Sequence, residues 1–166
     1  LREAGLTTPD VVSVHRRLAE ARDSGARSMS IEVSSHALDQ ARVAAVRFDT
    51  TVFTNLTRDH LDYHGTLEAY GAAKASLFHA PGLPRAVINV RDEFGRSLAA
   101  SLDPTIDRVL FSTSNELWVE PGAGWIRLPE LRATTAGLTL HVESSWGAGT
   151  LRSRLVGEFN AENLLA

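Results

Sequence analysis

Short apolar runs recur along the first two thirds of the chain and predict buried strands. The runs are TTVF at 50–53, AVINV at 86–90 and RVLF at 108–111. Each is rich in β-branched or aromatic residues, as is typical of strands. A fourth segment, RSMSIEV at 27–33, alternates apolar and polar positions. This alternation predicts another strand, with Glu32 near its C-terminal end.

Segments with helical spacing separate these predicted strands. A Thr-Pro-Asp start at 8–10, with Thr8 as the cap, begins a helix that Gly25 ends. Further helices are expected over 38–46, after the cap Thr66 as far as Phe78, and over 92–102. Strands that alternate with helices predict an α/β fold with a mostly parallel, doubly wound sheet.

The pattern changes after Ser112. Short alternating runs lie at 117–119, 125–128, 137–142 and 150–155, with Pro and Gly between them. They predict a small antiparallel sheet appended to the α/β core. The tryptophans Trp118, Trp125 and Trp146 are interpreted as the core of this sheet rather than as a platform on which bases stack.

Composition and charge fit one ordinary globular domain. The chain has 166 residues, of which 43% are hydrophobic and 22% charged, enough to build a core. A net charge of −3 argues against bulk attraction to nucleic acid or an anionic membrane. The absence of Cys rules out a disulfide framework and suits the cytoplasm. No apolar run approaches the roughly 18 residues that cross a membrane.

The loop after the run at 50–53 concentrates side chains that can do chemistry. It contains Arg58, Asp59, His60, Asp62, Tyr63 and His64. The carboxyl ends of parallel strands meet at one sheet edge, so Glu32 and His60 are expected there together. A carboxylate and an imidazole in that place can share a divalent cation. The alternative is two unrelated polar residues on an ordinary loop edge.

Lys74 lies in the apolar stripe of the helix that follows this loop. The stripe consists of Leu67, Tyr70, Leu77 and Phe78 at helical spacing. One interpretation is an amphipathic lysine that reaches past the stripe to water. The other is an ion-paired or chemically modified lysine, because desolvation favours the neutral, nucleophilic amine.

Four segments of the chain together resemble a known family. They are TNLTRDHLDYHG at 54–65, EAYGAAKASLF at 68–78, EVSSHALDQARV at 32–43 and GEFNAENLLA at 157–166. They resemble the central domain of the Mur ligases, ATP-dependent ligases that build the peptidoglycan stem peptide. The likeness is strongest to the E-type members, which add the third amino acid to UDP-N-acetylmuramoyl-L-alanyl-D-glutamate.

The resemblance implies a bacterial cytoplasmic enzyme that forms an amide through an acyl phosphate. Its cofactor would be Mg²⁺, its co-substrate ATP, and its other substrates the UDP-N-acetylmuramoyl-dipeptide and an amino acid, diaminopimelate or lysine. It implies neither a nucleic-acid nor a membrane partner.

The family's functional residues match positions in this chain. The implied metal ligands are Glu32, His60 and Lys74, with His60 and Lys74 also catalytic and Lys74 carbamylated (N6-carboxylysine). The implied substrate contacts are Thr7, Thr8, Ser34, Gln40 and Arg42, and the implied ATP contacts are Asn160 and Asn163.

We expect a partial domain over residues 1–166. It would comprise an α/β core over 1–111, the antiparallel sheet over 112–156 and the start of a helix over 157–166. The family's phosphate loop, G-x-x-x-x-G-K-[ST], does not occur in the sequence, and its C-terminal domain would follow Ala166. This partial domain is therefore expected to be inactive by itself.

Two other hypotheses remain open at this stage. One is a non-catalytic interaction module derived from such a domain. The other is a ligase of the folylpolyglutamate type, which shares the ATP chemistry, although the segment EVSSHALDQARV fits the E-type Mur ligases better.

Overall fold

The computed structural model describes residues 6–114 and 118–166, which form two compact units. The helical unit combines the described part of Leu1–Phe48 with Arg58–Ala80. The sheet unit combines Asp49–Thr57 with the described part of Pro81–Ala166. Among the described residues, no helix is long and apolar enough to cross a membrane.

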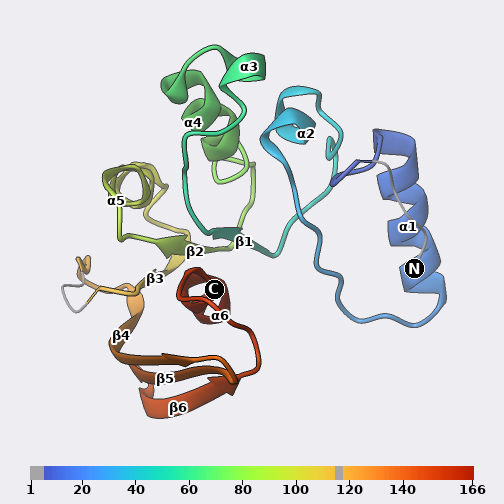
Figure 1. Ribbon diagram of the computed structural model, residues 1–166. Helices are drawn as coiled ribbons and strands as arrows, with labels where there is room; N and C mark the ends of the chain where they lie inside the picture. Colours follow the sequence, from blue (N-terminus) through green and yellow to red (C-terminus); the bar gives the residue numbers. More distant parts are fainter. Residues whose placement is uncertain (1–5, 115–117) are drawn as a thin grey trace. The chain divides into compact units, whose positions relative to one another are not determined.

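The sheet unit contains one six-stranded sheet with the strands in chain order (Figure 1). The strands are β1 (Thr50–Phe53), β2 (Arg85–Asn89), β3 (Asp107–Ser112), β4 (Gly124–Thr134), β5 (Gly137–Ser144) and β6 (Gly147–Ser153). Pairing is parallel from β1 to β4 and antiparallel from β4 to β6. The predicted α/β fold with an antiparallel part is confirmed, and β4 makes that part a continuation of the parallel sheet.

One face of the parallel strands is covered by α5 (Glu93–Ser101). Phe53, Ile88 and Leu110 stand beside one another in the register, so their side chains share a face. The ring of Phe53 lies 5.4 Å from that of Phe94 in α5. Asp92 caps this helix by accepting a hydrogen bond from the Gly95 N–H.

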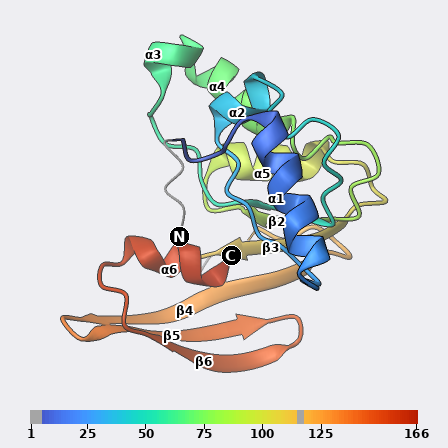
Figure 2. The same cartoon turned by 90° about the vertical axis from the view of Figure 1, so that its right-hand side faces the viewer.

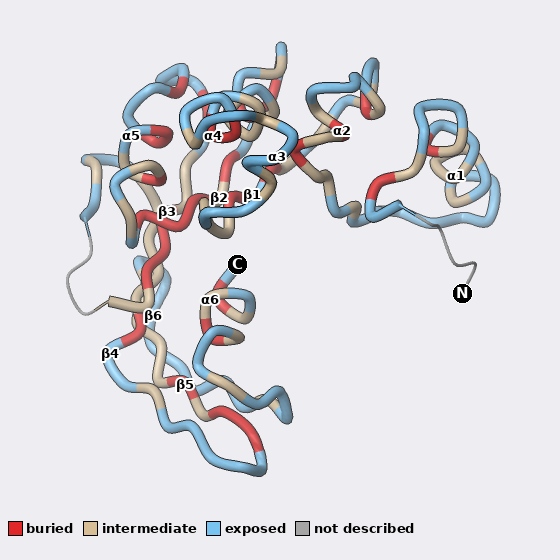
Figure 3. The backbone as a smooth tube through the Cα atoms, turned by 45° about the horizontal axis from the view of Figure 1, so that its top comes forward, coloured by how far each residue is buried: buried red, intermediate tan, exposed pale blue. Residues whose placement is uncertain are grey.

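The opposite face packs against α6 (Phe159–Leu165), which runs along the strands in Figure 2. The buried cluster there consists of Phe111, Leu128, Leu138, Leu140, Ala161 and Leu165. It joins β3, β4, β5 and α6 into one core, and Figure 3 shows the buried residues along β3 and β4. This core links the parallel and antiparallel parts of the sheet.

The interpretation of the tryptophans as a core is wrong. Trp118 is 38% exposed, Trp146 is 69% exposed and Trp125 is half-buried, and the buried cluster is formed instead by leucines of β4 and β5 with α6. Trp146 instead lies in the β5–β6 turn over Gly124, where an added Cβ would come within 2.6 Å of the indole ring. Of the run predicted at 117–119, Leu117 lies outside the described residues and Trp118 is not in a strand.

The helical unit holds four helices in the part that the structure describes. They are α1 (Val11–Asp23), α2 (Ser35–Asp39), α3 (Leu61–His64) and α4 (Leu67–Ala75). The predicted end at Gly25 and the Thr66 cap are both confirmed. The cap of α1, however, is Asp10 rather than Thr8.

Two other local predictions fail for stated reasons. The helix expected over 38–46 is replaced by α2 and a run of turns, because Ala41 and Ala45 take positive φ angles of 52° and 62°. The strand expected over 27–33 is irregular and mostly exposed. A strand needs a hydrogen-bonded neighbour, and among the described residues β1 pairs only with β2.

The core cluster can be tested with two leucines that face one another across β5 and β6. Leu140→Ala should lower the free energy of unfolding by about 2–5 kcal/mol, because it opens a cavity at a fully buried position. Leu151, its partner in the register, is 37% exposed, so Leu151→Ala should cost about 1 kcal/mol or less. Urea unfolding of both variants measures the difference, and equal losses would contradict the assigned core.

Candidate functional site

The polar loop predicted to carry chemistry enters the helical unit through a strained turn at His60. His60 takes the left-handed conformation, with φ 55° and ψ 22°. Such a backbone costs a non-glycine residue roughly 1 kcal/mol or more, so neighbouring contacts must maintain it. Asp59 provides them: its Oδ1 accepts a 2.8 Å bond from the His60 N–H, and its Oδ2 lies 3.7 Å from His60 Nε2.

Five aromatic rings, including that of His60, form what we call the ring cluster. They are the rings of His36, His60, Tyr63, His64 and Tyr70. His36 lies at the centre, with centroids 5.0 Å from His60, 4.0 Å from Tyr63 and 5.5 Å from His64. His36 was not predicted as a site residue, although it lies one helical turn before Gln40.

Lys74 contacts the ring cluster through Tyr70. Tyr70 and Phe78 are buried and Lys74 is half-buried, as the stripe predicts, but the helix expected as far as Phe78 ends at Ala75, so Phe78 lies in the turn after α4. The Nζ atom of Lys74 lies 5.0 Å from the centroid of the Tyr70 ring. Burial, with a smaller contribution from Asp59, raises the pKa of Tyr70, so this ring keeps its proton. Lys74 is also the only lysine in the sequence.

Thr8 ties the start of α1 to the segment that carries Glu32 and Ser34. Its side chain is fully buried, its hydroxyl donates to the Glu32 carbonyl at 2.9 Å, and it accepts from the Ser34 N–H at 2.9 Å. The Ser34 hydroxyl in turn caps α2 by accepting from the Ala37 N–H. Thr8 therefore has a structural function here, whereas Thr7 is exposed.

Arg42 brings a positive charge to the same place. Its Nη1 donates to the Thr8 carbonyl at 2.9 Å, and its Nε donates to Gln40 Oε1 at 2.9 Å. Thr8, Ser34, Gln40 and Arg42, all expected to contact substrate, thus lie in one hydrogen-bonded group. Such a group can receive an anionic ligand.

The expected metal ligands lie in the helical unit without forming a ready-made cage. Glu32 is exposed and His60 is half-exposed. Within residues 6–114 and 118–166, no three His, Cys, Asp or Glu side chains could together hold a metal ion. Because Mg²⁺ usually keeps several waters and takes only one or two protein ligands beside substrate phosphates, this donor set still suits it.

The expected ATP contacts lie on α6 in the sheet unit. Asn160 Nδ2 donates to the Val156 carbonyl at 2.9 Å, which closes the turn before the helix, and Asn163 is exposed. The neighbouring Glu162 pairs with Arg91 at 2.5 Å and lies 3.5 Å from the Thr113 hydroxyl.

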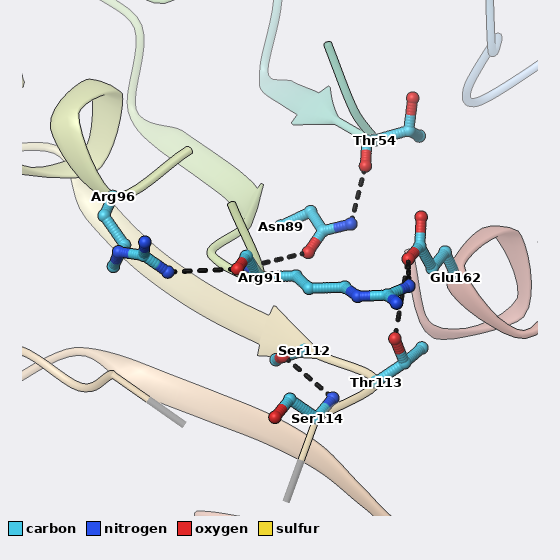
Figure 4. A network of polar contacts seen from close by, with 8 residues as sticks. All are labelled: Thr54, Asn89, Arg91, Arg96, Ser112, Thr113, Ser114 and Glu162. Carbon is cyan, nitrogen blue, oxygen red and sulfur yellow. Dashed lines mark hydrogen bonds and ion pairs between the residues drawn. The ribbon is translucent and has the colours of Figure 1, made fainter. Parts of the chain in front are cut away.

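A polar network at the carboxyl ends of β1, β2 and β3 was not predicted. Figure 4 shows Asn89 between the Thr54 carbonyl, to which it donates at 2.7 Å, and the Arg91 N–H, from which it accepts at 3.0 Å. Asn89 is 2% exposed. The signal was a lone amide within the apolar run AVINV, at the sheet edge where ligands bind.

A separate groove of about 440 Å³ opens in the sheet unit between the antiparallel strands and α6. Its lining includes Ile126, Val142, Trp146, Leu151, Leu164 and Leu165. None of the expected site residues lines it.

Comparison with known proteins gives consistent matches over the whole chain. The model of the Mur ligase middle domain matches residues 1–166. A protein of Chromobacterium violaceum is 53% identical over 166 residues, and one of Xanthomonas campestris is 50% identical over 164 residues. Both are named UDP-N-acetylmuramoyl-L-alanyl-D-glutamate--2,6-diaminopimelate ligase. The matches cover 100% and 98% of this chain, which spans 32% of the length of either relative.

A solved structure with the same name shares the fold. It matches with a TM-score of 0.81 at 35% identity, over 95% of this chain and 31% of the other.

The structural function of Thr8 can be separated from that of its exposed neighbour. Thr8→Val keeps the shape but leaves the Ser34 N–H without its acceptor, so the free energy of unfolding should fall by about 1–3 kcal/mol. Thr7→Val should change it by less than about 0.5 kcal/mol. Chemical denaturation compares the two, and a Thr8 variant as stable as the Thr7 variant would refute the bridge.

Proposed function

This chain belongs to the Mur ligase middle domain family, and we propose that it is the central part of an ATP-dependent amide ligase of peptidoglycan biosynthesis. The observation that carries the proposal is the hydrogen-bonded group of Thr8, Ser34, Gln40 and Arg42. Four residues that the family likeness assigns to one substrate meet in one place, beside the ring cluster.

The proposed reaction joins an acid to an amine at the expense of ATP. A substrate carboxylate oxygen attacks the γ-phosphorus of ATP, ADP leaves, and an acyl phosphate forms. The amine nitrogen of the incoming amino acid then attacks the acyl carbon, inorganic phosphate leaves, and the nitrogen loses a proton. Every reactant before the amine is anionic, so fixed positive charge such as that of Arg42 favours binding.

Mg²⁺ and ATP are the proposed cofactor and co-substrate. Glu32 would hold one Mg²⁺ and His60 a second, with Lys74 as a carbamate supplying a hard oxygen ligand to the second ion. When bound, Mg²⁺ neutralises charge that develops on the transferring phosphoryl group. Asn160 and Asn163 would contact adenine. Asn160 Nδ2 donates to the Val156 carbonyl, so the side-chain oxygen of Asn160, Oδ1, can accept a hydrogen bond from the base.

The proposed acid is UDP-N-acetylmuramoyl-L-alanyl-D-glutamate. The relatives' names favour diaminopimelate as the amino acid that is added. Mixing the complete protein with these compounds, ATP and Mg²⁺ tests the function directly. The proposal requires ADP release that depends on both the dipeptide and the amino acid, and amino-acid-independent ATP hydrolysis alone would refute it.

His60 is expected to act on the chemical step. His60→Ala in the complete protein should lower kcat by about tenfold to a thousandfold while the affinity for ATP changes little, because a ligand at the transferring phosphoryl group acts mainly in the transition state. His79→Ala, at an exposed histidine after α4, is the matched control. Unchanged turnover with weakened ATP binding would assign His60 to nucleotide binding instead.

The proposed carbamate on Lys74 predicts chemical rescue. Lys74→Ala should nearly abolish turnover, and added acetate should restore part of it, because a short acid can occupy the space of the missing carbamate. Lys74→Arg should not respond to acetate, since its side chain fills that space and its charge repels a metal. Initial rates of the variants are measured with and without acetate. A folded Lys74→Ala protein that turns over normally without acetate, or that acetate does not activate, rules out the carbamate.

A further inference from the structure

Two side chains without an assigned role extend the substrate-binding group into a row of hydrogen bonds. Gln40 Nε2 donates to the Tyr63 hydroxyl at 3.1 Å, and the Tyr63 hydroxyl donates to Asp39 Oδ2 at 2.7 Å. At the other end, Arg42 donates to Gln40 Oε1. The row Arg42–Gln40–Tyr63–Asp39 thus joins the α2 segment to α3, within the helical unit.

The chemistry of the two ends fixes every proton in this row. Arg42 can only donate, so it must face the oxygen of the Gln40 amide. The amide nitrogen then faces Tyr63, whose hydroxyl accepts from it and has a single proton left to donate. Asp39, as a carboxylate, can only accept and receives that proton. The reversed amide would set N–H against N–H, so the row has one orientation.

This orientation determines what Arg42 can offer a ligand. Its Nε and Nη2 both point to Gln40 Oε1, at 2.9 and 2.5 Å, and its Nη1 donates to the Thr8 carbonyl. Three of the five N–H groups of a guanidinium are used in these bonds, which leaves one on each terminal nitrogen. Both remaining N–H groups can donate to a carboxylate or phosphate.

The position of Asp39 supports a purpose beyond local stability. Asp39 is the last residue of α2, where the helix carbonyls disfavour a negative charge. Asp39, Gln40 and Tyr63 are all exposed, so their bonds contribute little to folding but can order a side chain at the surface. Tyr63 also packs against His36 with ring centroids 4.0 Å apart, which places its hydroxyl independently of the row.

We propose that Tyr63 and Asp39 are positioning residues that hold the Gln40 amide, and through it the Arg42 guanidinium, ready for an anionic group of the acidic substrate. The inference rests on the proposed function, because it takes Arg42 as a substrate contact. Without the Tyr63 hydroxyl the amide turns toward water, Arg42 loses its acceptor, and substrate binding must order both side chains.

The first test removes the hydroxyl and keeps the ring. Tyr63→Phe in the complete protein should raise KM for the UDP-N-acetylmuramoyl-dipeptide roughly fivefold to tenfold, as expected for one lost hydrogen bond. The kcat, the KM for ATP and the thermal midpoint should stay within experimental error. Asp62→Asn, at an exposed carboxylate in the same helix, is the control and should leave all four values unchanged.

The second test asks whether Tyr63 and Asp39 act in series. Asp39→Ala should raise the same KM, and the double variant with Tyr63→Phe should be no worse than the poorer single variant, because each change breaks the same row. Asp39→Asn should raise this KM less than Asp39→Ala does, since the amide oxygen of asparagine still accepts the tyrosine proton.

The outcomes separate this inference from the function on which it rests. An unchanged dipeptide KM in Tyr63→Phe, additive effects in the double variant, or equal losses in kcat and ATP binding would each overturn the positioning row. A wild-type protein without dipeptide-dependent ligation would instead refute the proposed function.

Discussion

The parallel register of β1, β2 and β3 is the constraint on which the polar edge of the sheet unit depends. Because the three strands pair side by side, the residues that follow them reach one edge of the sheet. There the side chain of the buried Asn89 donates to the Thr54 carbonyl, just beyond the last paired residue of β1. The polar loop thus leaves the sheet from a fixed point, and Arg91 meets Glu162 of α6 beside it.

Polar ties join segments of the helical unit that are distant in sequence. Thr8 bonds the Glu32 segment, Ser35 bonds His64, and Arg42 bonds the Thr8 carbonyl. Buried polar groups must be paired, so each tie is costly to remove. Because Thr8 and Arg42, which make two of these ties, are also proposed substrate contacts, substitutions at these two residues affect both binding and local folding.

The sequence predicted elements with strong local signals and failed where the outcome depended on partners. β1 was predicted with its observed bounds, and the Thr66 cap and the α4 stripe followed from helical spacing. The segment 27–33 has a strand's alternation, yet alternation cannot supply a neighbouring strand. The site residues were named through a family likeness, whereas the Tyr63–Asp39 bond joins residues distant in sequence that no spacing rule connects.

Strand β4 pairs with β3 on one side and with β5 on the other, and this limits how chimeras of this protein can be built. Its parallel side continues the sheet of β1, β2 and β3, and its antiparallel side carries the hairpin whose Leu138 and Leu140 support α6. The hairpin holds none of the proposed site residues, yet the helix bearing Asn160 and Asn163 rests on it. In a chimera between relatives, the hairpin and α6 therefore have to be inherited from the same parent.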